Sequence, residues 1–447
     1  MSARPHVIVV GGGFTGLSAA IEMARAGVCV TVLERDSTVG GLAGSFDVGG
    51  TRLEKFYHHW FTSDAHVHKL VADLGAADRI VTRPTNTGSY YANRLFRLSR
   101  PMDLLRYTPL SPLGRVRLGG LVFQARLVRD WRQLERLTAR EWLTSMCGRE
   151  VFSKVWGPLL RGKFGAHADE ISAVWIWNKL KLRGGSRGKG GEELLAYFRG
   201  GFAALADLMA RDIARHGGGV LTHTPVRGLV SKEGSVRGVR LEGEELEADA
   251  VLVTTPLPAF AGLAQGHLPT DYVRGLGRID YLGNVCLTLE LTRSLSGSYW
   301  LNVTDPDFPF VGVIEHTNFE PEETYGGRHI VYLSKYVPVG DPVYAMAPDE
   351  FLSYTLPYLK RMFPAFSEEW VQAAHLHRAP HAQPIVTRNY SALIPAEETP
   401  LEGLYVCTMA QIYPEDRGTN YAIGRGRAIG RRMARALRLR TALSSAA

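Results

Sequence analysis

Residues 6–16 read His-Val-Ile-Val-Val-Gly-Gly-Gly-Phe-Thr-Gly, and this stretch decides the fold. An apolar run typical of a strand leads into a glycine turn that opens a helix, which is the arrangement that binds dinucleotides. Gly11 permits the tight turn, Gly13 lets the backbone approach a pyrophosphate, and Gly16 lets the helix pack closely on the strand. The stretch therefore predicts the start of a nucleotide-binding domain.

The residues that follow complete a strand, helix and strand unit of normal length. Phe14 and Thr15 begin the helix, so we expect their N–H groups to face the phosphates. The helix is expected over 16–27 and the second strand over 29–34. Glu34 closes that strand, where a carboxylate accepts the ribose hydroxyls. An acid at this position disfavours a 2′-phosphate, so FAD or NAD is favoured over NADP.

A second glycine turn favours FAD over NAD as the cofactor. Glu-Arg-Asp at 34–36 is followed by Val-Gly-Gly-Leu-Ala-Gly-Ser at 39–45, which is more than NAD binding requires. Here the sequence resembles the flavin amine oxidase superfamily, in which an acid, a basic residue and a Gly-Gly turn hold the extended FAD. The resemblance implies that Arg35 pairs with phosphate and that the backbone of 41–43 passes near the flavin.

Residues 403–423 resemble the closing FAD motif of the same superfamily, which is a strand, a loop and a helix. The resemblance implies that N–H groups near residues 420 and 421 point at the flavin and stabilise negative charge on its reduced form. Many members carry Ala-Gly-Asp after the strand, whereas this chain has Cys-Thr-Met at 407–409. Glu415 or Asp416 is therefore the candidate for the missing acid.

The resemblance also implies a contact between the adenine and the main chain of Val226. The complete set of predicted FAD contacts is Gly11, Gly13, Phe14, Thr15, Gly16, Glu34, Arg35, Gly41, Leu42, Ala43, Val226, Met409, Glu415, Thr419, Asn420 and Tyr421.

The pattern of elements predicts an α/β fold, α+β overall. A Rossmann-like FAD-binding domain of the glutathione reductase type is expected from the discontinuous segments 1–85, 196–259 and 385–447. The segments 86–195 and 260–384 are expected to form an inserted substrate domain. The first of these is rich in Trp, Arg and Leu and is typical of helices, whereas the second alternates apolar and polar residues as an antiparallel sheet does.

The composition is that of an ordered, enzyme-sized protein. The 447 residues are 45% apolar and 21% charged. The four cysteines are too few and too scattered for a disulfide framework or a zinc site, which favours a reducing, cytoplasmic location. We expect a small-molecule substrate, no bound metal and no nucleic-acid partner, and the sequence leaves the oligomeric state open.

The net charge is +8, and much of the excess lies in residues 94–140 and in the final helix, Arg-Gly-Arg-Ala-Ile-Gly-Arg-Arg-Met-Ala-Arg-Ala-Leu-Arg-Leu-Arg. Two interpretations stay open. These segments are either solvated basic faces or amphipathic surfaces that make peripheral contact with a membrane.

Within the superfamily, the chain resembles protoporphyrinogen oxidases and UDP-galactopyranose mutases. The segment Glu-Lys-Phe-Tyr-His-His-Trp at 54–60 resembles the mutase segment in which a His lies beside the flavin. However, Lys-Tyr-Val-Pro at 335–338 stands where the mutases have Arg-Glu-Tyr-Pro. We therefore expect an FAD-dependent oxidoreductase that transfers hydride from or to a small organic substrate, such as a sugar or prenyl derivative. The alternative is a mutase-like isomerase acting on a nucleotide sugar.

His58, Lys335 and Tyr336 are the candidates for acid–base or polar contacts at the flavin ring, by resemblance and by their places at strand or loop ends. The alternative for His58 is a hydrogen-bonded packing histidine, and the alternative for Lys335 is a solvent-facing lysine. No catalytic triad is required, because the flavin itself performs the hydride chemistry.

A phosphate clamp is the remaining hypothesis. Arg183 and Arg187 lie in a glycine-rich tract at 183–193, and with Lys163 they could bind a phosphorylated substrate. The alternative for this tract is a solvated loop.

Overall fold

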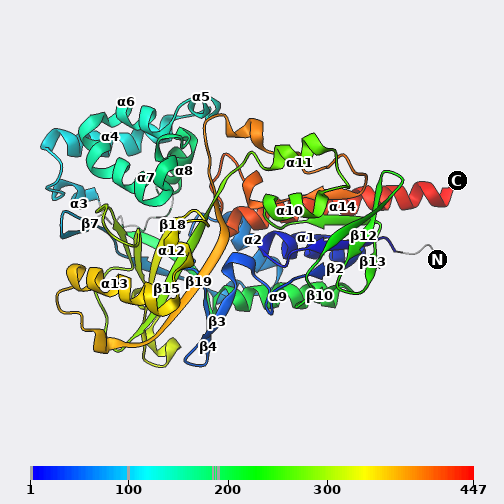
Figure 1. The fold of residues 1–447 in the computed structure, drawn as a ribbon, viewed down its shortest axis with the longest axis horizontal. Coiled ribbons are helices and arrows are strands. Elements are labelled where there is room, and N and C mark those ends of the chain that lie inside the picture. The colour runs from blue at the N-terminus through cyan, green and yellow to red at the C-terminus, as the bar shows by residue number, and fades with distance from the viewer. Residues whose placement is uncertain (1–3, 98–100, 184–185, 187, 189–191, 447) are drawn as a thin grey trace.

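The first glycine turn follows the central strand of a parallel five-stranded sheet (Figure 1). The computed structural model describes residues 4–97, 101–183, 186, 188 and 192–446. The strands lie in the order β10 (Gly219–Leu221), β2 (Cys29–Leu33), β1 (His6–Val10), β14 (Ala250–Val253) and β20 (Leu404–Val406). All pairings are parallel. Stretches from both ends and the middle of the chain thus build one sheet, as expected of a Rossmann-like fold, while the domain boundaries stay a prediction.

Helix α1 (Phe14–Arg25) follows the turn and packs between two others, α9 (Gly201–Arg215) and α14 (Thr419–Ala446). A Cβ on Gly430 would lie 2.5 Å from the carbonyl oxygen of Ala19, so α14 can approach α1 this closely only with glycine there. Arg427 is buried and pairs with Glu22 and, at 2.6 Å, with Asp73. Part of the basic charge of this final helix is therefore used inside the protein.

Residues 219–232 form two strands that belong to different sheets. The chain leaves the parallel sheet at Leu221, passes through a positive φ of 52° at His223, and re-forms as β11 (Gly228–Lys232). Pro225 interrupts the run, since proline has no N–H to donate. Strand β11 belongs to a separate antiparallel sheet with β12 (Ser235–Arg240) and β13 (Glu245–Glu247).

The expected antiparallel sheet of the substrate domain is present and larger than predicted. Its order is β19 (Val371–Pro384), β15 (Tyr281–Leu291), β18 (His329–Val337), β17 (Gly312–Glu315), β16 (Trp300–Val303), β7 (Thr87–Tyr91) and β8 (Arg94–Arg97). The β16–β7 pair is parallel. Strands β7 and β8 come from the segment expected to be helical, so the sheet joins both insertions.

The first insertion otherwise forms a cluster of helices at the end of the molecule away from both termini (Figure 1). These are α3 (Pro101–Leu105), α4 (Pro112–Leu127), α5 (Arg132–Glu135), α6 (Ala139–Val151), α7 (Gly157–Phe164) and α8 (Ala173–Arg183). Over the described ranges, no helix is both long and apolar enough to cross a membrane.

The remaining helices and strands lie in the connections between the strands of these sheets. They are β3 (Ser45–Val48), β4 (Thr51–Glu54), β5 (Trp60–Phe61), β6 (Ile80–Thr85), β9 (Glu193–Phe198), α2 (Ala65–Asp73), α10 (Leu257–Ala264), α11 (Thr270–Leu276), α12 (Pro342–Ala345) and α13 (Pro348–Met362).

Candidate active site and cofactor cradle

The two glycine turns predicted from the sequence meet backbone to backbone. The Gly40 N–H donates to the Gly12 carbonyl at 2.9 Å, and a Cβ on Gly41 would lie 3.2 Å from the Gly13 Cα. A Cβ on Gly16 would lie only 2.1 Å from the Gly11 carbonyl oxygen. Side chains at these positions would collide with backbone, so glycine is required for the turns to meet.

The start of α1 is open to an anion. Its N-cap is Gly13, which supplies no side-chain acceptor, and the first turn has no acidic residue. Within the described part of the chain, no hydrogen bond joins the N–H groups of Phe14, Thr15 or Gly16 to an acceptor. Unpaired N–H groups and the positive end of the helix dipole together suit a phosphate.

Glu34 is buried beside this cradle. Its carboxylate accepts one hydrogen bond from the Gly12 N–H at 2.8 Å and another from the Asp36 N–H at 3.0 Å. It keeps further lone pairs for the predicted ribose contact. The chain after β10 runs alongside, since the Thr224 N–H donates to the Glu34 carbonyl at 2.8 Å. Val226 lies just beyond and is half-buried, and its main-chain contact with adenine stays a prediction.

Arg35 is highly exposed, and its ion pair is with Asp36 at 3.6 Å. Its predicted pairing with a phosphate stays a prediction.

The closing motif brings α14 to the other end of the cradle. Thr419, Asn420 and Tyr421 at the start of α14 line a cavity together with Leu42 of the second glycine turn. Ala43, beside Leu42, is buried in the core. The predicted flavin contacts from the two ends of the chain therefore converge.

The side chain of Asn420 binds the protein's own backbone. Its Oδ1 accepts hydrogen bonds from the N–H groups of His66 and Val67, at 3.0 and 3.2 Å, and so caps α2. These bonds use the side-chain oxygen alone, and the predicted flavin contact of the Asn420 backbone N–H stays a prediction.

The two candidates for the predicted acid, Glu415 and Asp416, line different hollows. Asp416 lines the main cavity, whereas Glu415 lines a separate hollow beside His66 and Arg425. Met409 is half-buried in a short turn capped by the Thr408 hydroxyl, and it does not line either hollow. Of these residues, Asp416 is the one placed to contact a ligand in the main cavity.

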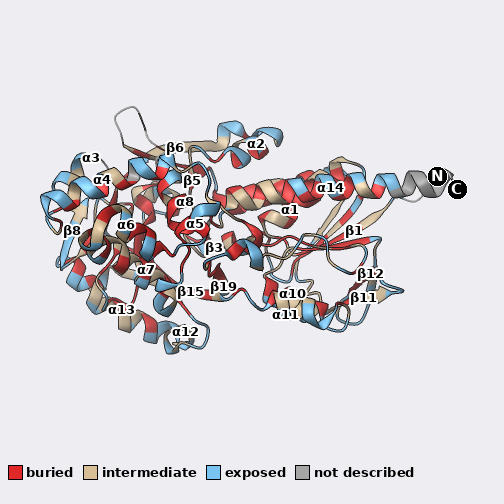
Figure 2. Ribbon diagram, turned by 90° about the horizontal axis from the view of Figure 1, so that it is seen from above, coloured by how far each residue is buried: buried red, intermediate tan, exposed pale blue. Residues whose placement is uncertain are grey.

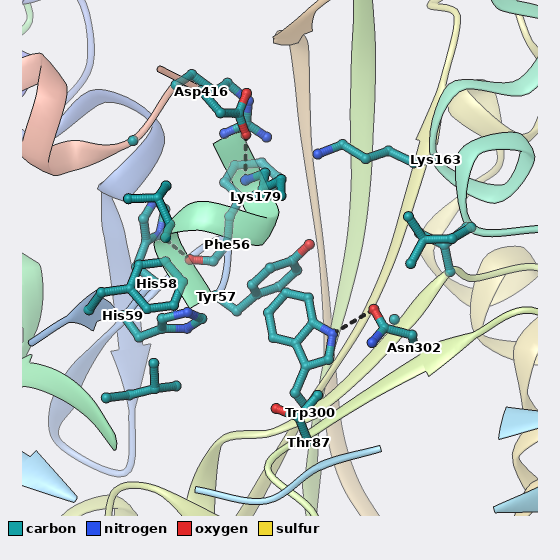
Figure 3. Close-up of a pocket in the computed structure, with 18 of the residues that line it drawn as sticks. Phe56, Tyr57, His58, His59, Thr87, Lys163, Lys179, Trp300, Asn302 and Asp416 are labelled. Carbon is teal, nitrogen blue, oxygen red and sulfur yellow. Dashed lines mark hydrogen bonds and ion pairs between the residues drawn. The ribbon is translucent and has the colours of Figure 1, made fainter. Parts of the chain in front are cut away.

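The cavity has a volume of about 360 Å³ and lies between the helical cluster, the large sheet and the start of α14 (Figure 3). One end is aromatic: Tyr57 lies edge-on to Trp300, with ring centroids 4.9 Å apart, and the Trp300 Nε1 donates to Asn302 at 3.0 Å. Other aromatic residues in the wall are Phe61, Trp156, Trp175, Tyr299 and Tyr336. Such walls suit a flat or extended apolar molecule.

The other end is charged. Lys179 pairs with Asp416 at 2.5 Å, and the Trp175 Nε1 donates to the same carboxylate at 3.1 Å. Although burial opposes it, the cation Lys179 holds the pKa of Asp416 below its usual range. Arg417 donates to the Tyr336 hydroxyl at 2.8 Å and so orients that ring toward the cavity.

Lys163 extends from α7 into the space between the two ends (Figure 3). Its ammonium lies over the rings of Trp175 and Tyr336, at 4.7 and 5.2 Å from their centroids. Burial lowers the pKa of Lys163 well below its usual range, and the nearby positive charges of Lys179 and Arg417 add to this against the pull of Asp416. Among the described residues, Lys163 forms no ion pair with a carboxylate, and burial disfavours the charged form of its amine.

His58 also lines the cavity. Its Nδ1 lies 2.5 Å from the Phe56 carbonyl, an acceptor only, so the proton sits on Nδ1 and Nε2 carries a lone pair. Burial lowers the pKa of His58 to about 4. The imidazole is therefore neutral near pH 7, and its buried position makes it harder to protonate than a free imidazole.

Lys335, expected beside the flavin, does not line the cavity. It precedes Tyr336 on β18, and successive residues of a strand point to opposite faces. Tyr336 faces the cavity, so Lys335 points away, and Asp341 is the charge that acts on it. The sequence places both residues on one strand, but it does not show which of the two side chains faces the cavity.

The phosphate clamp is only partly described. Lys163 is in the cavity, Arg183 is described only by its backbone at the end of α8, and Arg187 lies outside the described residues.

Sequence reasoning missed several residues of the wall, above all Trp175, Lys179 and Trp300. A signal existed for the first two, because residues four apart on a helix lie on one face. Their places in an apolar run, Val-Trp-Ile-Trp-Asn-Lys, indicated a lysine held among aromatic rings.

Comparison with known proteins identifies the family. The model of the flavin containing amine oxidoreductase family matches residues 14–422. The chain belongs to this family. It is accordingly an enzyme with FAD as its cofactor, and the glycine cradle, the open start of α1 and the buried Glu34 fit that group.

The chain also has relatives in sequence. It is 26% identical over 293 residues to coproporphyrinogen III oxidase of Bacillus subtilis (strain 168), covering 58% of this chain and 62% of that one. It is 25% identical over 327 residues to phytoene desaturase of Cercospora nicotianae, covering 66% and 52%. The matches span less than two thirds of the length of these relatives.

The fold is shared with solved structures. One, from Exiguobacterium sp. 255-15, has a TM-score of 0.76 at 16% identity and covers 97% of this chain and 99% of that chain. Cyclohexylamine oxidase from Brevibacterium oxydans has a TM-score of 0.70 at 17% identity, covering 98% and 100%. At such identities the likeness shows the fold alone.

Proposed function

We propose that this amine oxidoreductase removes hydride from an apolar or conjugated organic substrate that carries an anionic group. The aromatic end of the cavity would hold the apolar body, and the charged end would hold the acid. The names of two relatives, an oxidase and a desaturase, agree with an oxidation.

The observation that carries this proposal is Lys163. The carboxylate that acts on it, Asp416, is already bound by Lys179 at 2.5 Å. Burying a cation without a partner is costly, and a substrate carboxylate or phosphate would remove that cost. The anion would also restore the charge that burial disfavours on Lys163.

The rest of the chemistry divides between the cofactor and the protein. FAD, when bound, supplies the hydride acceptor. The protein's residues hold the substrate: Tyr57 and Trp300 against its apolar face, and Lys163 at its acid. His58, neutral and with a lone pair on Nε2, would accept a hydrogen bond from a polar N–H or O–H group of the substrate.

The test mixes the purified yellow protein, without oxygen, with an anionic substrate such as coproporphyrinogen and with an uncharged one such as phytoene. Loss of flavin absorbance on addition of the anionic compound supports the proposal. Conversion of a nucleotide sugar only by pre-reduced enzyme, with no reductant consumed, would instead favour the mutase-like alternative.

Lys163→Met sharpens this test, because methionine keeps the volume of the side chain and removes its charge. We expect the apparent KM for the anionic substrate to rise at least tenfold, roughly the loss of one buried charge-assisted hydrogen bond, with the FAD content unchanged. A methyl ester of the same substrate should be bound equally by both proteins. Lys335→Met is the matched control, since that lysine points away from the cavity.

A further inference from the structure

Helix α4 carries an apolar stripe on its solvent side. Leu113, Val116, Phe123 and Leu127 are between 58 and 70% exposed. With Gly120 they are spaced by three, four, three and four residues, which places them along one face of a helix. A stripe this regular differs from isolated exposed apolar residues, which are common on protein surfaces.

The opposite face of α4 is already used for packing. Leu118, Leu121 and Ala125 are buried in the helical cluster, and the Trp177 Nε1 of α8 donates to the Ala125 carbonyl at 2.8 Å. The helix is therefore apolar on two sides, and one of them has no partner among the described residues.

The apolar surface extends beyond α4 to Leu95, Met102 and Leu105 of the preceding strand and helix. Seven of the eleven large apolar side chains that are exposed in the described structure lie between residues 95 and 127. Figure 2 shows α3 and α4 at the end of the molecule far from both termini. We call these seven residues the α3–α4 surface: Leu95, Met102, Leu105, Leu113, Val116, Phe123 and Leu127.

The same stretch is strongly basic. Residues 94–129 contain eight Arg, no Lys and a single acid, Asp103, so their net charge is +7, that is, eight minus one. The whole chain has a net charge of +8, so the remainder is close to neutral. Arg94, Arg106, Arg117 and Arg129 are among the exposed members.

We propose that the α3–α4 surface docks on an anionic phospholipid bilayer. The stripe would enter the boundary between headgroups and acyl chains, while the arginines bind lipid phosphates. A second copy of the chain fits less well, because two surfaces that each carry this excess of positive charge would repel. The surface is separate from the cavity, and the proposal does not depend on which substrate the enzyme oxidises.

Docking would place the bilayer one helix away from the cavity. Helix α8 lies between the two: its Ile176 and Leu180 line the cavity, while its Trp177 contacts α4. An apolar substrate dissolved in the membrane would then have a short distance to travel.

The test is sedimentation of the FAD-bound protein with large vesicles, either of phosphatidylcholine alone or with phosphatidylglycerol added. We expect the protein to pellet with the anionic vesicles and to be released by high salt. Val116→Gln with Phe123→Gln should lower the partition coefficient at least tenfold. Arg117→Gln with Arg129→Gln should lower it roughly fivefold for each charge removed.

The matched control is Val339→Gln with Leu439→Gln, because those side chains are exposed to a similar degree elsewhere. This control should pellet as the wild type does, and all variants should keep their flavin absorbance. Three results would overturn the proposal: no pelleting with anionic vesicles, equal pelleting of the Val116 and Phe123 variant, or a dimer in light scattering that this variant converts to a monomer.

Discussion

Single glycines determine whether the cofactor cradle can form and whether it stays open. Gly13 and Gly16 lie three residues apart, yet a methyl group at each would meet different surroundings. At Gly13 the nearest atom is the Gly41 Cα at 3.9 Å, and the backbone φ of −73° is one that any residue adopts. At Gly16 the nearest atom is the Gly11 carbonyl oxygen at 2.1 Å.

We therefore predict that Gly13→Ala folds normally but weakens FAD binding at least tenfold, roughly the 1.4 kcal/mol expected when a methyl group enters the phosphate cradle. Gly16→Ala should instead lower the stability of the apoprotein itself. The ratio of flavin to protein and the melting temperature separate the two effects. Equal loss of stability in both variants would contradict the assignment of Gly13 to the ligand side.

His58 provides a prediction in pH. Its folded-state pKa is about 4, below the unfolded value near 6.5, so the unfolded chain binds this proton first as the pH falls. The free energy of unfolding should therefore fall between about pH 6.5 and pH 4, by about 3 kcal/mol from this group. His58→Asn should be less sensitive to pH over that interval in urea unfolding. Parallel curves for the two proteins would show that His58 is not buried as described.

For Lys335 and Tyr336, the sequence predicts the strand but not which side chain faces the cavity. The sequence indicated a strand over 329–336, and the structure has β18 over nearly the same residues. Side chains alternate between the two faces of a strand. Over residues 331–335 both faces carry uncharged side chains, apart from Lys335, so the sequence does not distinguish the two faces. Which face meets the cavity depends on the neighbouring β15 and β17, and the sequence of one strand does not contain that information.

The close packing of α14 on α1 can be tested by a single substitution. We predict that Gly430→Ala costs about 2 kcal/mol of stability, because the added carbon would lie 2.5 Å from the Ala19 carbonyl oxygen. Flavin content should fall as well, since α14 carries the cavity residues 419–421.

The control for this prediction is Gly262→Ala in α10, where an added Cβ meets nothing within 4 Å. It should raise stability by up to about 1 kcal/mol through helix propensity. Chemical denaturation of both variants gives the comparison, and an unchanged Gly430→Ala protein would mean that α14 packs less closely than described.

Elements with strong local signals were the ones predicted correctly. The strands β1 and β2 have continuous apolar runs, and the helix α1 has clear helical spacing. Strands β7 and β8 have few apolar residues between them and lie beside arginine-rich helices, so their sequence favoured the wrong class. Strand β7 pairs with β16, more than 200 residues away, and β8 pairs with β7, so no local pattern in the sequence indicates this sheet.

At the scale of the whole molecule, FAD would connect stretches from both ends of the chain. Glu34 and the glycine turns belong to the first fifty residues, and the start of α14 lies beyond residue 418. A ligand that binds only the folded chain adds its binding energy to the stability. We predict that FAD at a hundred times its Kd raises the free energy of unfolding of the apoprotein by about 2.7 kcal/mol. A melting temperature that does not respond to FAD would contradict this bridging role.

The parallel sheet also has a consequence for synthesis. Strand β20 supplies its last strand and α14 covers α1, although both come about four hundred residues after β1. A ribosome releases the N-terminal glycine turn long before the segment that completes its surroundings. The nucleotide-binding core of the nascent chain therefore stays partly exposed until translation is nearly finished.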